Sequence, residues 1–219
     1  MSNFTLSPQQ SAVVSWVTQS TGSLNLKSYA GTGKTFTIER ICENVPMTAQ
    51  VFVGSFNKAI ADELAARIIY TNVKCGTFHS LGFQLLRRML GNVKIETESR
   101  KVSGLCRKHF KYDKKNAEAL AKLVSFGKQE GFGIPGVPID SNELWTKVAD
   151  HHDLWDDFTD VSPDRIINLC VAVSRESLEL CKTGVIDFDD MLLAPLAFST
   201  KHYGLYDWVL IDEAQDLNE

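Results

Sequence analysis

The chain has 219 residues, of which 44% are hydrophobic and 23% charged, a composition typical of a folded globular protein rather than a disordered one. Its net charge of −4 excludes a generic polyanion-binding protein. The five cysteines are scattered and form no CxxC pair, which indicates reduced thiols rather than a disulfide framework or a zinc site. No apolar run approaches the ~18 residues of a membrane helix, and the N-terminus has no signal sequence, so we expect a cytoplasmic protein without a membrane partner.

The charge is distributed unevenly. Residues 100–128 carry nine basic and two acidic residues, a local charge of +7, whereas residues 150–160 contain five aspartates. A basic segment in an acidic chain is either a footprint for a phosphate backbone or a solvated helix face.

The first ninety residues alternate between apolar runs and helical spacing. We expect strands over 24–30, 50–55 and 72–78, and helices over 34–44, 57–69 and 80–90. Strands and helices that alternate at these lengths predict a parallel sheet covered by helices.

The middle of the chain, from about 96 to 183, shows helical stretches and no convincing strand. Its last helix is expected to begin with Ser162 as cap and Pro163 in the first turn, and to stop at Gly184. Strand character returns over 206–214. The sequence therefore predicts an α/β domain (1–92 and 184–219) interrupted by an all-helical insertion (93–183).

A glycine-rich turn, KSYAGTGKT (27–35), joins the first expected strand to the first expected helix. Backbone N–H groups in such a turn converge on phosphate oxygens, and the helix N-terminus adds a favourable dipole. Lys34 is expected to contact the β- and γ-phosphates, and the Thr35 hydroxyl to bind Mg²⁺. The nucleotide-binding residues predicted in this turn are Ala30, Gly31, Thr32, Gly33, Lys34, Thr35 and Phe36.

Two carboxylates follow the last expected strand, in VLIDEAQD (209–216). Ligands bind at the carboxyl ends of parallel strands, so Asp212 is a candidate Mg²⁺ ligand and Glu213 a candidate for orienting and deprotonating an attacking water. Gln215 is a candidate sensor of the γ-phosphate, with turn formation as the alternative role.

Six segments in this order together resemble the UvrD/Rep type of superfamily 1 helicases. They are LSPQQ (6–10), AGTGKT (30–35), SFNKAIADEL (55–64), TFHSLG (77–82), DFDDML (187–192) and LIDEAQD (210–216). The resemblance implies an ATP- and Mg²⁺-dependent translocase on single-stranded DNA. It also implies a RecA-like P-loop sheet, here incomplete, with a helical insertion subdomain.

The resemblance assigns further roles. Gln10 would read the adenine edge, and Phe36 stands where relatives often carry an arginine that packs on adenine. Asn57 and Lys58 would contact the DNA strand, as would Thr77 and His79. The acidic residues of DFDDML suit a helix N-terminus, so a structural role is as plausible there as a catalytic one.

The helicase motifs that follow LIDEAQD in this family do not occur in the chain. We therefore expect the N-terminal part of a helicase, which lacks the second motor domain and has little activity alone. A partner protein or that missing domain would cover an exposed sheet edge. The alternatives are a natural binding module without efficient ATP turnover and, less well supported, a different P-loop ATPase.

Overall fold

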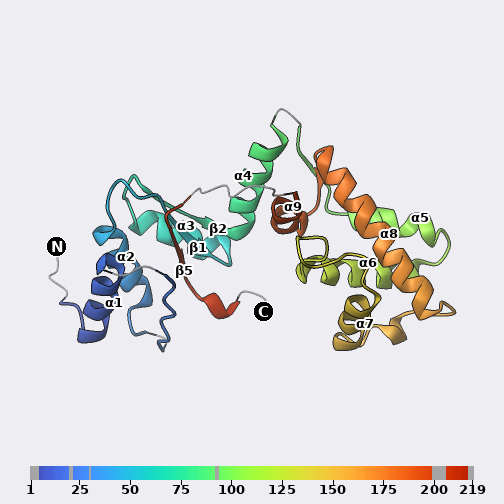
Figure 1. Ribbon diagram of the computed structural model, residues 1–219, viewed down its shortest axis with the longest axis horizontal. Coiled ribbons are helices and arrows are strands. Elements are labelled where there is room, and N and C mark those ends of the chain that lie inside the picture. The colour runs from blue at the N-terminus through green and yellow to red at the C-terminus, as the bar shows by residue number, and fades with distance from the viewer. Residues whose placement is uncertain (1–4, 20–21, 30, 92–93, 199–205, 217–219) are drawn as a thin grey trace. The chain divides into compact units, whose positions relative to one another are not determined.

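The computed structural model describes residues 5–19, 22–29, 31–91, 94–198 and 206–216, and these form two compact units (Figure 1). Unit 1 comprises Met1–Phe78 with His202–Glu219, and unit 2 comprises His79–Lys201. The domain boundaries expected from sequence remain a prediction.

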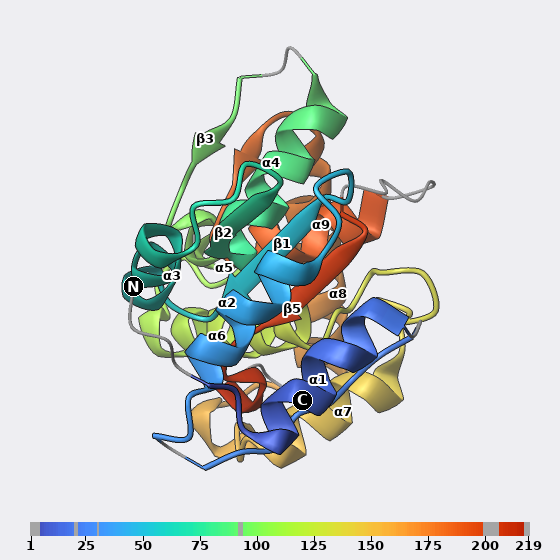
Figure 2. The same ribbon diagram turned by 90° about the vertical axis from the view of Figure 1, so that its left-hand side faces the viewer.

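Unit 1 is organised around a three-stranded parallel sheet (Figure 2). Strand β1 (Val51–Ser55) lies between β2 (Val73–Thr77) and β5 (Trp208–Ile211), with Val51 in register with both Val73 and Trp208. These are three of the four strands expected from sequence, and their parallel pairing confirms the predicted α/β class.

The two faces of this sheet are covered unequally. Alternate residues of each strand, such as Val51 and Val53, pack with helices α1 (Pro8–Gln19), α2 (Lys34–Asn44) and α3 (Lys58–Arg67) in one hydrophobic core. On the other face Phe52 packs against the rings of Phe78 and Tyr206, whereas Val209 and Ile211 are exposed. Because side chains of a strand alternate between faces, β5 presents apolar surface on its second face.

The prediction of a strand over 24–30 is wrong. Residues 23–29 form no strand, Leu24 and Leu26 are 46% and 45% exposed, and Ala30 lies outside the described residues. A strand is stabilised by pairing with a neighbour, and this segment pairs with none of the three strands β2, β1 and β5. Alternating apolar residues were therefore not sufficient to recruit this segment to the sheet.

Unit 2 is mainly helical. Its elements are α4 (Phe78–Leu90, which begins at the last residue of unit 1), β3 (Glu96–Thr97), α5 (Lys101–His109), α6 (Lys114–Gln129), α7 (Asn142–His151), the 3₁₀ turn η1 (Trp155–Asp157), α8 (Pro163–Lys182), β4 (Val185–Ile186) and α9 (Asp190–Phe198). Trp145 of α7 is fully buried in the main core, and Gly127 of α6 provides the space for its ring, because a Cβ there would lie 2.3 Å from Trp145. The large indole thus packs directly against the α6 backbone.

The helical insertion departs from expectation in two details. Residues 96–97 form the short strand β3, which pairs in parallel with β4, although no strand was expected there. Ser162 occupies the cap position of α8 and Pro163 its first turn, but the Ser162 side chain makes no capping hydrogen bond. Within the described residues, no helix has the length and apolar character needed to cross a membrane.

Candidate functional site

The glycine-rich turn of unit 1 ends at the N-terminus of α2. Gly31 and Gly33 have φ angles of 76° and 85°, in the left-handed region that favours glycine. Helix α2 begins at Lys34, and its N-cap residue Gly33 makes no side-chain capping bond. The helix dipole favours an anion at this end.

Gln10 of α1 lies beside this turn. Its backbone N–H donates to Ser7 Oγ, and its Oε1 accepts from the Ser7 N–H, at 3.2 and 3.0 Å. These reciprocal bonds cap α1, which begins at Pro8. A Cβ on Gly33 would lie 3.1 Å from Gln10 Nε2, so the cap holds the amide of Gln10 against the glycine-rich turn.

Lys34 meets the carboxylate that follows β5. Its ammonium forms an ion pair with Glu213, and the amide of Gln215 donates to the second oxygen of Glu213. The Lys34 and Gln215 bonds hold the pKa of Glu213 below its ordinary value. Glu213 has a φ of 54°, unusual for a residue other than glycine. The fold therefore brings together three residues that the sequence predicted as catalytic.

Asp212 is buried at the carboxyl end of β5. Asp212 is 7% exposed, and its backbone N–H donates to the Gly54 carbonyl at 3.0 Å. Burial raises the pKa of its carboxyl, as does the charge of Glu213, while Lys34 acts in the opposite direction. The Asp212 carboxylate therefore carries a negative charge that its surroundings do not fully compensate.

This charge, the glycine-rich turn and the Thr35 hydroxyl in the first turn of α2 fit a magnesium nucleotide. Mg²⁺ is usually bound through one or two carboxylates together with substrate phosphates. No group of three or more potential metal-binding side chains occurs in the part of the chain that the structure describes.

Phe36, also in the first turn of α2, lies under the guanidinium of Arg40, whose Cζ is 5.1 Å from the ring centroid. This arrangement is a cation–π contact. The predicted contact of Phe36 with adenine stays a prediction.

The residues expected to contact DNA in unit 1 lie at the carboxyl ends of β1 and β2. Asn57 caps α3 by accepting a 2.9 Å bond from the Ile60 N–H, and Lys58 is exposed at the start of that helix. Thr77 ends β2 in register with Ser55. The Ser55 hydroxyl is buried and has no hydrogen-bond partner among the described residues. Polar groups thus gather at the sheet edge where ligands usually bind.

His79, the remaining predicted DNA contact, lies in unit 2 and stacks on Phe188. The ring centroids are 3.7 Å apart with an angle of 19° between the planes. Burial lowers the pKa of His79, and Asp189 partly offsets this effect. Phe188 is 59% exposed and was not singled out from the sequence. Its position between aspartates in DFDDML, where an apolar residue is unexpected, was the available signal.

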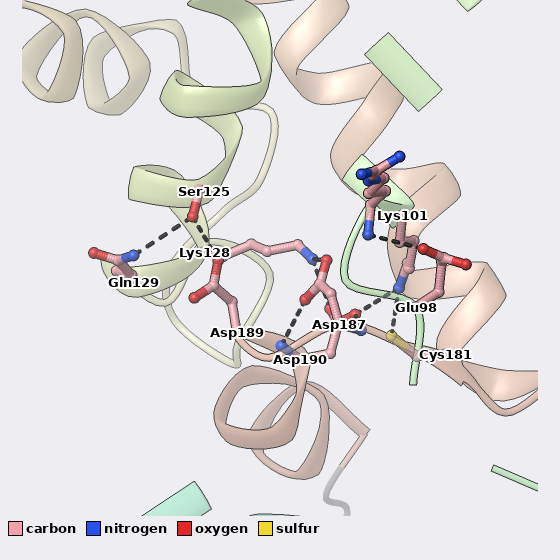
Figure 3. Close-up of polar contacts among 10 residues, drawn as sticks. Glu98, Lys101, Ser125, Lys128, Gln129, Cys181, Asp187, Asp189 and Asp190 are labelled. Carbon is pink, nitrogen blue, oxygen red and sulfur yellow. Dashed lines mark hydrogen bonds and ion pairs between the residues drawn. The ribbon is translucent and has the colours of Figure 1, made fainter. Parts of the chain in front are cut away.

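The aspartates around Phe188 form an arrangement that we call the carboxylate clamp, made of Asp187, Asp189 and Asp190 with Lys101, Ser125 and Lys128 (Figure 3). The Asp187 N–H donates to Asp190 Oδ2 at 2.8 Å, and the Asp190 N–H donates to Asp187 Oδ1 at 3.0 Å. These reciprocal bonds cap the start of α9. The predicted structural role of the motif is thereby explained.

Two buried lysines complete the clamp. Lys128 lies 2.6 Å from Asp187 and 2.8 Å from Asp190, and Lys101 lies 2.6 Å from Asp190. Burial opposes the charge on Asp190, but Lys128 and Lys101 hold the pKa of its carboxyl below the ordinary value. Lys128 keeps a raised pKa against its burial because of Asp190 and Asp187. Ser125 donates to Asp189 at 2.5 Å, so all three aspartates are anchored while Phe188 between them is exposed.

Comparison with known proteins gives an independent result. A search of curated proteins found no match. The sequence pattern of the UvrD/REP helicase N-terminal domain, in contrast, matches residues 6–219. This match confirms the resemblance drawn from the six motifs and the expectation of an incomplete RecA-like sheet with helical additions. The chain belongs to the UvrD/Rep helicase family and corresponds to its N-terminal domain.

Proposed function

We propose that this chain is the ATP-binding and single-stranded-DNA-binding portion of an ATP-dependent DNA helicase. The observation that carries this proposal is the ion pair of Lys34 with Glu213, formed where the N-terminus of α2 meets the carboxyl end of β5. In this position Lys34 would exchange Glu213 for the β- and γ-phosphates of ATP. Phosphate oxygens accept charge-assisted bonds from lysine and from helix N–H groups.

The bound nucleotide would be oriented by residues of this chain. Gln10 would meet the adenine edge, Gly31, Thr32 and Gly33 would surround the phosphates, and Phe36 would pack near the base. Thr35 and Asp212 would hold Mg²⁺, whose chemistry is to neutralise charge on the phosphates. Once Lys34 turns to phosphate, Glu213 would orient and deprotonate a water, with Gln215 holding its second oxygen.

We further propose that each unit contributes contacts to single-stranded DNA. In unit 1 these are Asn57, Lys58 and Thr77, at the strand ends. In unit 2 they are His79 and Phe188, whose stacked and partly exposed rings suit contact with an unpaired base. Stacking of a base on an aromatic side chain contributes ~1–3 kcal/mol.

A second motor domain, or a partner protein, would complete the machine. Val209 and Ile211 expose apolar surface on one face of β5. Leu24 and Leu26, just before the glycine-rich turn in the sequence, are also exposed. Exposed apolar surface of this kind favours coverage by another element. An arginine that a second domain or partner inserts into the nucleotide site raises phosphoryl-transfer rates by ~10³–10⁵-fold. We therefore expect the chain alone to hydrolyse ATP slowly. The same exposed surface supports the alternative function, a helicase-like binding module that acts through its partner.

The test is binding of a fluorescent ATP analogue with Mg²⁺, followed by hydrolysis with and without oligothymidylate. Lys34→Ala should abolish nucleotide binding, whereas Lys147→Ala, which removes an exposed lysine of unit 2, should leave it unchanged. Fast DNA-stimulated turnover by the chain alone would contradict the need for a further domain. Nucleotide binding that survives Lys34→Ala would contradict the proposed site.

A separate measurement addresses DNA. His79→Ala and Phe188→Ala should each weaken oligothymidylate binding several-fold, because each removes one ring of the stacked pair. Equal binding by both variants and the unmodified chain would remove these residues from the proposal.

A further inference from the structure

The α5–α6 turn of unit 2 carries a group of residues that neither the nucleotide site nor the carboxylate clamp uses. Residues 110–113 join the two helices, and an open pocket of about 340 Å³ lies there. It is lined by Arg107, Phe110, Lys111, Tyr112 and Lys114, and none of these is a carboxylate.

The structure separates this turn from the rest of the basic segment 100–128. Lys101 and Lys128 are buried in the carboxylate clamp, and Lys108 pairs with Glu176 at 2.6 Å. Arg107 and Lys111 are exposed and form no ion pair or hydrogen bond with any residue that the structure describes. Arg107 and Lys111 thus leave uncompensated positive charge at the turn.

Tyr112 is fully exposed at the tip of this turn, whereas Phe110 is buried in the core beneath it. Phe110 therefore anchors the turn, and the fold gains no packing from the Tyr112 ring. An exposed aromatic ring next to the unpaired Lys111 is an arrangement suited to a ligand with both negative charge and flat apolar faces.

Helix electrostatics account for only part of the charge. Arg107 and Lys108 lie in the last turn of α5, where cations suit the dipole. Lys114 and Lys115 lie in the first turn of α6, where cations are unfavourable. Lys114 pairs with Glu118 at 3.5 Å, and Lys115 donates to the Thr159 hydroxyl at 3.3 Å. The Asp113 carboxylate points back to its own helix and accepts from the Asn116 N–H at 3.0 Å. Contacts within unit 2 thus account for Lys114 and Lys115, whereas Lys111, in the turn itself, has no such contact among the described residues.

We propose that the α5–α6 turn is a binding site for single-stranded nucleic acid. Arg107 and Lys111 bind backbone phosphates, and Tyr112 stacks on an unpaired base. Single-strand sites combine a cationic track with aromatic platforms in this way. The inference adds a DNA-contact region in unit 2 to the proposed function. It rests on that function only in taking single-stranded nucleic acid as the ligand.

The experiment measures anisotropy of a labelled oligothymidylate with the full chain over a range of salt concentrations. Arg107→Ala with Lys111→Ala should weaken binding and reduce the slope of log K against log salt by about 1.4, because each phosphate contact on a single strand contributes about 0.7. Tyr112→Ala should weaken binding about tenfold, and Tyr112→Trp should restore it. The matched control, Lys147→Ala with Arg175→Ala, removes two exposed cations that are ion-paired elsewhere in unit 2 and should leave the slope unchanged.

Unchanged affinity in the double variant or in Tyr112→Ala would overturn the proposal. Equal binding of a duplex, with no effect of Tyr112→Ala, would indicate a duplex backbone site and would also overturn it. If turn variants leave DNA binding intact while Lys34→Ala loses ATP, only this inference fails. If turn variants weaken DNA binding but the unmodified chain does not bind ATP, only the nucleotide part of the proposed function fails.

Discussion

The glycine-rich turn of unit 1 and the carboxylate clamp of unit 2 both pair lysine with carboxylates distant in the sequence, but at different depths. The side chains of Lys34 and Glu213 are 27% and 28% exposed, whereas those of Lys128 and Asp190 are 2% and 0% exposed. Exposed pairs contribute ~0–1 kcal/mol, and breaking a buried one costs ~3–5 kcal/mol. The first pair can therefore release its lysine to a ligand, while the second holds a fixed shape.

The largest test of this contrast is Lys128→Met. It leaves Asp187 without its lysine and Asp190 with Lys101 alone, so we expect the free energy of unfolding to fall by ~3–5 kcal/mol. Urea unfolding followed by circular dichroism measures it. Lys147→Met, at an exposed pair, should change stability little. If Lys128→Met lowers the free energy of unfolding by less than ~1 kcal/mol, the buried pairs of the clamp contribute no more than exposed surface pairs do.

A smaller effect should come from Gly82→Ala in α4, because a Cβ there would lie 1.9 Å from the Met191 carbonyl oxygen of α9. We expect a loss of ~1–3 kcal/mol from this overpacking. Gly104→Ala is the matched control, since a Cβ at this helical position of α5 meets nothing within 4 Å. It should stabilise the chain by ~0.5–1 kcal/mol. Equal melting temperatures for the two variants would contradict the close approach of α4 and α9.

Glu213→Gln tests the exposed pair. The free energy of unfolding should change by less than ~1 kcal/mol, and nucleotide binding should persist because Lys34 is freed. ATP hydrolysis, in contrast, should fall ~10²–10⁴-fold with the loss of a general base. Thermal unfolding and a phosphate-release assay measure these two effects. A strong loss of stability would show that the pair maintains the fold.

The smallest expected change is a gain of stability from Asp212→Asn. Burial and Glu213 raise the pKa of Asp212, so the folded state binds its proton more tightly than the unfolded chain does. The stability that protonation adds is present at low pH and is lost as pH rises through the raised pKa. At pH 7 the asparagine should therefore be the more stable form, and the difference should shrink toward pH 4. Urea unfolding of both forms at pH 7 and pH 4 measures this difference in stability. An asparagine variant that is less stable than the unmodified chain at pH 7 would contradict the prediction.

The residues alone were enough to predict the sheet strands at 50–55, 72–78 and 206–214 and the long helix that begins at Pro163. Short buried apolar runs and a proline in the first helical turn are local signals that act within a few residues. The motifs also assigned Lys34 to the phosphates and Glu213 to the attacking water of one nucleotide site. The ion pair between these two side chains was not predicted and comes from the fold.

Tertiary structure decided the rest. Residues 24–29 have strand-like alternation but pair with no strand of the sheet, because pairing is a long-range contact that local alternation does not specify. Lys101 and Lys128 appeared in the sequence as two more charges of a basic segment, yet the fold buries them against Asp187 and Asp190. Burial and pairing depend on residues about 60 to 90 positions away, and hydrophobic patterning carries no information about which distant charge will be met. Only the packing of the unit 2 helices determines which lysines pair with the aspartates beside Phe188 and which cations stay exposed at the α5–α6 turn.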